Sequence, residues 1–299
     1  MVKYRYPGIR AEGYLMIKFT KMHGIGNCYI YVNCFEEEVF NPSKMAEFVS
    51  DVHFGIGSDG LVLIMPSDKA DFKMRIFNAD GSEAEMCGNA VRCVGKYVYD
   101  NKLTDKTDIT VETLSGIKEL ELDVINHEVV SVTVSMGKAE LDPKKIPISL
   151  DGESVVGRRI DVGGEAYEIT GVSMGNPHAV VFVDSTDSLD LEKLGPKFEN
   201  HELFPERINT EFIEVIDGDT LKMRVWERGS GETWACGTGA CAAVVAAVLS
   251  GYCKRNREIK VKLRGGALKI IYLDDGTVIK KGPATFVCEG EVEVPPIAR

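Results

Sequence analysis

The sequence has no long apolar run and no signal-peptide pattern. Its most apolar stretch, ACAAVVAAVLSG at residues 240–251, is far shorter than the ~20 residues that a membrane-spanning helix needs. The first residues, MVKYRYPGIRAEGYLM, include basic side chains but no apolar core and no small-residue cleavage site. We therefore expect no membrane association and a cytoplasmic location.

A concentrated basic tract is also missing. The 299 residues carry a net charge of -11, and the charged residues are scattered, which argues against a nucleic-acid partner. The glycine-rich stretch FGIGSDG at residues 54–60 does not match the spacing of a dinucleotide-binding loop. Hydrophobic residues make up 44% of the chain, which is enough for a packed core.

The eight cysteines form no CxxC pair and no zinc-finger-like cluster with histidine. We therefore expect neither a disulfide framework nor a metal site. In a reducing compartment most of these residues should be free thiols that pack as small hydrophobic side chains. The question is which cysteines do more than pack.

Strand-like stretches separated by turn motifs dominate the chain, and helical stretches are few. This composition predicts an α+β fold rather than a doubly wound sheet. Helices are expected at residues 42–53, 88–101, 190–200 and 237–251. Cys87 and Cys236 lie 149 positions apart, and each is followed by glycine and a helical stretch, as a duplicated unit would produce.

A cysteine at a helix start has a possible chemical role. The first N–H groups of a helix are unpaired and carry partial positive charge, which stabilises a thiolate and lowers its pKa below ~8.5. Gly88, Asn89, Gly237 and Thr238 also expose N–H groups that suit a carboxylate. A cysteine that merely packs before a helix is the simpler alternative.

Two further polar clusters suggest a small-molecule site. Asn176 and His178 lie directly before a strand-like stretch. Glu227 and Arg228 lie at the end of another, just before glycines. An ordinary turn and a surface ion pair explain these clusters equally well.

Five motifs together resemble the diaminopimelate epimerase family: KMHGIGN, RIFNADGSEAEMCGNAVRC, VSMGNPHAV, ERINTEF and VWERGSGETWACGTGACAA. The resemblance spans residues 17–293. It implies two pseudo-symmetric halves, each a β-barrel-like sheet around a central helix, with the active site between them. The halves expected are 17–135 plus 281–293 and 136–280, after an N-terminal extension of residues 1–16.

The resemblance also implies an activity. Cys87 and Cys236 would be the catalytic pair, one thiolate and one thiol, that interconvert LL- and meso-diaminopimelate in lysine biosynthesis without pyridoxal phosphate or metal. His178 and Glu227 would tune the thiol pKa values, and relatives suggest a homodimer. The implied substrate ligands are Asn27, Asn78, Gly88, Asn89, Asn176, Asn209, Glu227, Arg228, Gly237 and Thr238.

Cys28, Gly60 and Ala90 depart from the family pattern and leave substrate discrimination open. The main alternative is a same-fold racemase of another amino acid, such as proline or hydroxyproline. A binding protein without activity is a second alternative. A redox sensor that pairs the two cysteines is a third.

Overall fold

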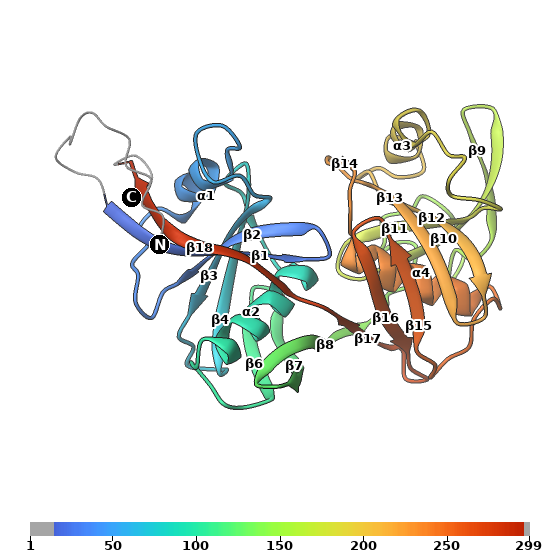
Figure 1. The fold of residues 1–299 in the computed structure, drawn as a ribbon. Coiled ribbons are helices and arrows are strands. Elements are labelled where there is room, and N and C mark those ends of the chain that lie inside the picture. The colour runs from blue at the N-terminus through green and yellow to red at the C-terminus, as the bar shows by residue number, and fades with distance from the viewer. Residues whose placement is uncertain (1–14, 296–299) are drawn as a thin grey trace. The chain divides into compact units, whose positions relative to one another are not determined.

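The computed structural model describes residues 15–295, and within them the fold is α+β, with four helices and eighteen strands. The chain divides into two compact units (Figure 1). The first contains the residues up to Val134 and those from Pro283 onward, and the second is Ser135–Gly282. Among the described residues, no helix has both the length and the apolar character required to cross a membrane. Residues 1–14 of the expected extension lie outside the described part.

The first unit is a mixed sheet with two helices. The strands are hydrogen-bonded in the order β18-β1-β2-β3-β4-β6-β7-β8, with parallel steps at β2/β3 and β4/β6 and antiparallel steps elsewhere. The elements are β1 (Leu15–Gly24), β2 (Asn27–Asn33), α1 (Pro42–Ser50), β3 (Gly60–Met65), β4 (Phe72–Asn78), β5 (Glu83–Ala84), α2 (Gly88–Asp100), β6 (Asp108–Thr113), β7 (Gly116–Ile125), β8 (Glu128–Lys138) and β18 (Thr285–Val294).

The second unit repeats this topology. Its order is β9-β10-β11-β12-β13-β15-β16-β17, with parallel steps at β11/β12 and β13/β15. The elements are β9 (Arg158–Val162), β10 (Glu165–Ser173), β11 (Pro177–Phe182), α3 (Leu191–Glu199), β12 (Asn209–Asp217), β13 (Thr220–Glu227), β14 (Gly231–Glu232), α4 (Gly237–Leu249), β15 (Ile259–Leu263), β16 (Gly266–Tyr272) and β17 (Thr277–Gly282).

The spacing of 149 residues between the two cysteines holds over a long segment. Helix α3 begins and ends 149 residues after α1, and α4 begins and ends 149 residues after α2. The tripeptide KMR at residues 73–75 recurs at residues 222–224 with the same offset. The prediction of a duplicated unit with one cysteine turn in each copy is therefore confirmed.

In each unit the helix that follows the cysteine packs against the sheet (Figure 1). Helix α4 consists almost entirely of alanine, valine, glycine and cysteine, and its side chains from Ala240 to Ala247 have no exposed area. It contacts β10, β11, β12, β13, β15 and β16. A helix that is apolar on all sides is suited to burial, and its small residues let the strands approach from several directions. Helix α2 contacts β1, β2, β4 and β7.

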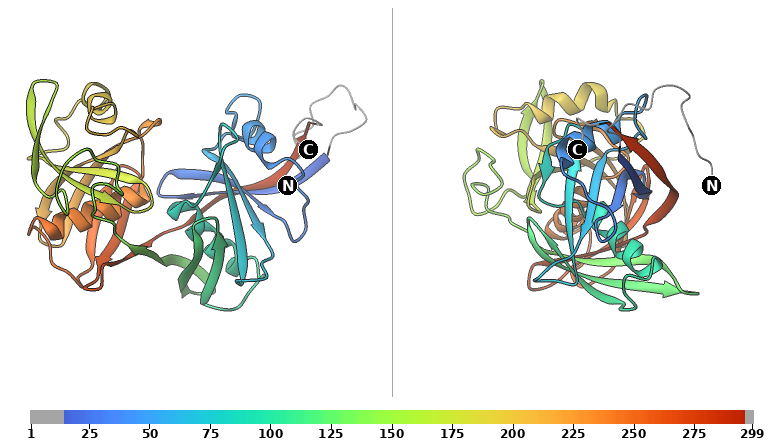
Figure 2. Two further views of the ribbon diagram at one scale, coloured as in Figure 1. Left: turned by 180° about the vertical axis from the view of Figure 1, so that it is seen from behind. Right: turned by 90° about the vertical axis from the view of Figure 1, so that its left-hand side faces the viewer.

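The last strand returns to the first unit. Strand β18 pairs antiparallel with β1, so that Leu15 lies opposite Val294 and Ile17 opposite Val292. Both ends of the described chain therefore lie side by side at one edge of this unit, where the left view of Figure 2 shows the first strand, in blue, beside the last strand, in red.

The expected helix over residues 42–53 is shorter in the structure. It ends at Ser50 because Asp51 takes an extended conformation, with φ -60° and ψ 125°. All eight cysteines are within the described residues, and no disulfide is formed among them there. Four are buried, and Cys288 is exposed.

Candidate active site

Cys87 is the N-cap residue of α2, as the sequence predicts. Its Sγ lies 3.5 Å from Asn27 Oδ1, which also accepts a hydrogen bond of 3.3 Å from Asn89 Nδ2. Asn27 Nδ2 in turn donates to Asp59 Oδ2 at 2.8 Å. Three of the predicted site residues thus form one contact group, and the half-buried sulfur of Cys87 is part of it.

The remaining predicted residues of this unit, Asn78 and Gly88, lie close to Cys87 along the chain. Asn78 ends β4 and is exposed, and its Nδ2 donates to Ser82 Oγ at 3.0 Å. Gly88 opens α2 directly after the cysteine. The hairpin between β4 and the short strand β5 therefore brings Asn78 to the segment that leads into the cysteine turn.

Cys236 is the N-cap residue of α4 and is buried. Its Sγ accepts a hydrogen bond from Gly239 N at 3.3 Å and lies 3.5 Å from Thr238 Oγ1. Gly237 is the first helical residue. The sulfur thus receives one of the unpaired N–H groups of the helix start.

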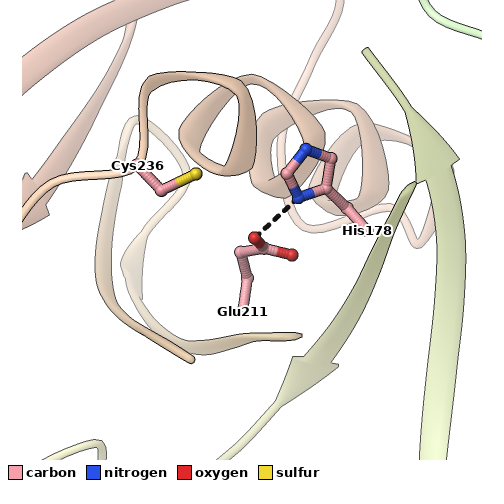
Figure 3. Close-up of side chains that lie close together, drawn as sticks. All are labelled: His178, Glu211 and Cys236. Atoms are coloured by element: carbon pink, nitrogen blue, oxygen red, sulfur yellow. Dashed lines mark hydrogen bonds and ion pairs between the residues drawn. The ribbon is translucent and has the colours of Figure 1, made fainter. Parts of the chain in front are cut away.

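His178 and Glu211 lie beside this sulfur (Figure 3). His178 Nδ1 is 2.8 Å from Glu211 Oε1, and both side chains are fully buried. His178 Nε2 is 3.0 Å from Asn176 Oδ1. A nitrogen of His178, an oxygen of Glu211 and the sulfur of Cys236 all lie within 4.8 Å of one another. They form one buried group of side chains beside the start of α4.

Glu211 is a site residue that the sequence reasoning missed. It sits in β12 two residues after Asn209, where a strand pattern alone gives no sign of a buried carboxylate. The signal was available through the repeat, because the residue 149 positions earlier is Val62. A glutamate in place of an apolar strand residue marks a buried charge with a specific partner.

The expected low pKa of the cysteine thiols does not hold for Cys236. Burial, followed by the carboxylates of Glu227 and Glu211, raises the pKa of Cys236 well above its usual range. The hydrogen bonds from Thr238 and the Gly239 N–H act in the opposite direction but are smaller. The prediction was wrong because the helix start was visible in the sequence and the burial was not.

Glu227 is similarly affected by its surroundings. Burial raises the pKa of Glu227 above its usual value, opposed by hydrogen bonds from Thr233 and Cys236. The Thr233 hydroxyl donates to Glu227 Oε1. This carboxyl is therefore placed to exchange a hydrogen bond with the thiol of Cys236.

Arg228 and Asn209 are linked to each other and not to Glu227. Arg228 N donates to Asn209 Oδ1 at 3.0 Å, and Arg228 Nη1 donates to the backbone oxygen of Glu206 at 3.0 Å. Asn209 Nδ2 donates to the backbone oxygen of Pro177 at 2.7 Å. Asn209 thus fixes the backbone of Arg228, and no Glu227–Arg228 ion pair forms among the described residues.

Each unit holds the segment before its cysteine with an arginine–glutamate fork. Arg75 donates through Nε and Nη2 to the two oxygens of Glu83, at 2.7 and 2.9 Å. Arg224 makes the same two bonds to Glu232, at 2.8 and 3.0 Å. In both units the glutamate precedes its cysteine by four positions. Bidentate pairs of this kind fix orientation as well as distance.

The departure at Gly60 has a structural reason. A Cβ atom at this position would lie 2.0 Å from the backbone oxygen of Phe77. The pairing of β3 with β4 therefore excludes any larger residue here unless the backbone moves. Cys28, at a second departure, donates its backbone N–H to Asp59 Oδ2 at 2.7 Å.

The fold defines a structural class of two-unit α+β proteins that includes other solved structures. It is similar to a hydroxyproline epimerase from Agrobacterium vitis, with a TM-score of 0.69 and 13% identity over 95% of this chain and 94% of that one. It is equally similar to a PhzF-family protein from Bacillus anthracis, with a TM-score of 0.69 and 17% identity over 94% of this chain and 100% of that one. At such identities the likeness establishes the fold alone.

Sequence comparison identifies the family within this class. The family model for diaminopimelate epimerase matches residues 19–141 and 170–287, and the chain belongs to that family. It is 60% identical to the diaminopimelate epimerase of Acetivibrio thermocellus over 93% of this chain and 99% of that relative. It is 56% identical to that of Methanococcus maripaludis, over 93% of this chain and 100% of that relative. The earlier resemblance is therefore confirmed.

Proposed function

We propose that this chain interconverts LL- and meso-diaminopimelate, with Cys87 and Cys236 as its acid–base pair. The observation that supports this most directly is the equivalence of the two sulfurs: each is the N-cap residue of a helix, and the helices occupy matching places in the repeated topology. The identity of 50% or more to several diaminopimelate epimerases favours this substrate over proline or hydroxyproline.

In the proposed reaction a thiolate on one face of the substrate removes the α-hydrogen as a proton. The thiol on the other face gives its proton to the same carbon, so that one C–H bond breaks, another forms, and nothing is oxidised or reduced. The two sulfurs exchange roles in the reverse direction. N–H groups at the starts of both helices, from Gly88, Asn89, Gly237 and Thr238, would stabilise the charge that develops on the α-carboxylate.

The other predicted residues have supporting roles in this proposal. Arg228 would receive the distal carboxylate of the substrate in a bidentate contact, with its backbone held by Asn209. Asn27, Asn78 and Asn176 would bind the polar groups near the reacting carbon. His178 and Glu227 would adjust the proton affinity of Cys236. A nitrogen of His178 lies within 4.8 Å of the sulfur, and Glu227 hydrogen-bonds the thiol.

The proposal extends to the organisation of the protein. Residues 17–135 with 281–293, and residues 136–280, would be the two epimerase halves. The enzyme would act in lysine biosynthesis in the cytoplasm, as a homodimer, without pyridoxal phosphate or metal. An absorption spectrum with a bound chromophore, or loss of activity with a chelator, would contradict the last point.

The substrate is tested by measuring stereochemical inversion of LL-diaminopimelate beside proline and hydroxyproline. Inversion of diaminopimelate alone supports the proposal. Inversion of proline or hydroxyproline instead would establish the alternative racemase, and inversion of none would favour a binding protein.

The catalytic pair is tested by Cys87→Ala and Cys236→Ala. Each substitution should abolish net inversion, because epimerisation needs a proton carrier on both faces of the carbon. Circular dichroism should remain that of the wild type. Exchange of the α-hydrogen in deuterated water reports the surviving sulfur separately. Full inversion by either variant would refute the two-base reaction.

A further inference from the structure

The two units differ at three positions beside the cysteine. At an offset of 149 residues, the second unit has one histidine and two glutamates where the first has tyrosine, valine and asparagine. The pairs are Tyr29 and His178, Val62 and Glu211, and Asn78 and Glu227. The environments of the two sulfurs therefore diverged in charge although the backbone kept its spacing.

Of the three, Glu211 is the least expected residue. Its side chain is fully buried in β12, and Oε1 is used by His178 Nδ1. Its other oxygen, Oε2, has no hydrogen-bond partner among the described residues. Burying a carboxylate with an unpartnered oxygen costs folding free energy, so the presence of Glu211 in this strand indicates a role beyond packing.

The first turn of α4 is shaped around this carboxylate. A Cβ atom at Gly239 would lie 2.4 Å from Glu211 Oε1 and 3.1 Å from Cys236 Sγ. Only glycine leaves room for both groups against the helix start. The equivalent position in the first unit is Ala90, and the residue at the position of Glu211 in that unit is Val62. The glycine and the glutamate thus occur together in one unit and are both absent from the other.

We propose, on the basis of the epimerase function above, that Glu211 keeps the resting proton on Cys236, so that Cys236 is the proton donor and Cys87 the acceptor before substrate binds. Glu211 touches no reacting atom and is a positioning residue. It acts through its negative charge and through the orientation that it gives to His178.

The charges that face Cys236 support this assignment. The carboxylates of Glu227, from β13, and Glu211, from β12, both oppose loss of the thiol proton. The hydroxyl of Thr238 and the N–H of Gly239, both at the start of α4, act in the other sense, and a nitrogen of His178, from β11, lies within 4.8 Å of the sulfur. Burial is the largest influence on the pKa of the Cys236 thiol, and Coulomb interactions over a few ångströms are strong in a buried cluster, so the charge of Glu211 should add measurably to the hold on this proton.

The assignment has a kinetic consequence. The resting enzyme would be ready for the isomer whose α-hydrogen faces Cys87. The other isomer would require the proton to move from Cys236 to Cys87 first. Removing the charge of Glu211 should therefore reduce the difference between the two sulfurs.

The test uses Glu211→Gln, which removes the charge but keeps an acceptor oxygen for His178 Nδ1. The full-length protein is labelled with ¹³C at cysteine Cβ, and the chemical shifts are followed from about pH 6 to pH 11 without substrate. Signals are assigned with Cys87→Ser and Cys236→Ser. In the wild type, Cys236 should keep its proton to higher pH than Cys87. In Glu211→Gln the midpoint of Cys236 should fall by about one pH unit, which is a tenfold change in proton affinity.

Two controls make the result specific. Glu214→Gln lies on the same strand and removes a carboxylate that contacts Thr186 and Lys222, so the Cys236 signal should not change. Glu211→Asp keeps the charge and should keep the wild-type order of the two sulfurs. An unchanged Cys236 midpoint in Glu211→Gln, or a wild type in which Cys87 keeps its proton longer, overturns the proposal. Neither outcome depends on epimerase activity, whose absence would instead refute the proposed function.

Discussion

The two cysteines at the helix starts, Cys87 and Cys236, show how much the surroundings of a residue matter. Both are N-cap residues, and both precede glycine, yet Cys236 is buried beside two carboxylates while Cys87 is half-buried beside amide side chains. The sequence was sufficient to find both sulfurs and their helix starts. Glu211 could be noticed only by comparing the two halves at the offset of 149 residues. The raised pKa of Cys236 could not be predicted, because burial and cross-strand contacts depend on tertiary packing.

A second buried thiol, that of Cys93, makes the stability of the protein depend on pH. Cys93 is fully buried in α2, and burial raises its pKa from 9.0 to about 11. The folded state therefore holds this proton more tightly than the unfolded chain does. The resulting stability is complete below pH 9 and is lost as pH rises through about 11.

We expect the unfolding free energy to fall by about 2–3 kcal/mol between pH 8 and pH 11 on account of Cys93 alone. Cys93→Ala should lower stability at pH 8 by about 1 kcal/mol, through lost packing, but should show a shallower decline with pH. Urea unfolding at several pH values measures both effects. Cys288→Ala, at an exposed thiol, is the matched control. An identical decline in wild type and Cys93→Ala would contradict the argument.

At the scale of elements, local patterns predicted most of the fold. The four expected helices exist, and strands such as Gly60–Met65 and Phe72–Asn78 match the stretches predicted from alternation and β-branched residues. In the sequence the constant offset between the halves is visible at the cysteines and at the repeated tripeptide KMR. That the same offset relates α1 to α3 could be seen only in the structure. The two helices begin and end at equivalent positions, but their side chains differ at most of these positions.

The arginine–glutamate forks yield a prediction for the elements that precede the cysteines. Arg224→Lys keeps the charge but cannot make two parallel hydrogen bonds to Glu232, and both groups are largely buried. We expect a loss of about 1 kcal/mol in unfolding free energy and a several-fold drop in inversion rate, because the turn that presents Cys236 becomes less fixed. The measurements are urea unfolding and the inversion assay.

A surface ion pair provides the comparison. Lys193 and Asp190 are mostly exposed, so Lys193→Met should change stability by no more than about 0.5 kcal/mol and leave inversion intact. If Arg224→Lys behaves like this control, the fork does not position the cysteine turn.

At the scale of the whole molecule, two similar units carry one cysteine turn each, and the first is completed by the end of the chain. Strand β18 comes from the C-terminal part of the sequence but forms an edge of the first unit through β1. The first unit therefore cannot form fully until the second has been synthesised. This assignment followed from the family resemblance and not from any local pattern.

The pairing of Leu15 with Val294 means that the backbone has almost closed on itself, since opposite residues of antiparallel strands are about 5 Å apart. A short glycine–serine linker could join residue 295 to residue 15, with new ends cut between Asn126 and His127. Both of these residues are exposed and have positive φ at the tip of the β7–β8 turn. Such a circular permutant should fold and invert substrate at a rate close to that of the parent. A cut within α4 should prevent folding. A permutant cut at Asn126 that fails to fold would mean that the order of synthesis, and not only the final pairing, is required.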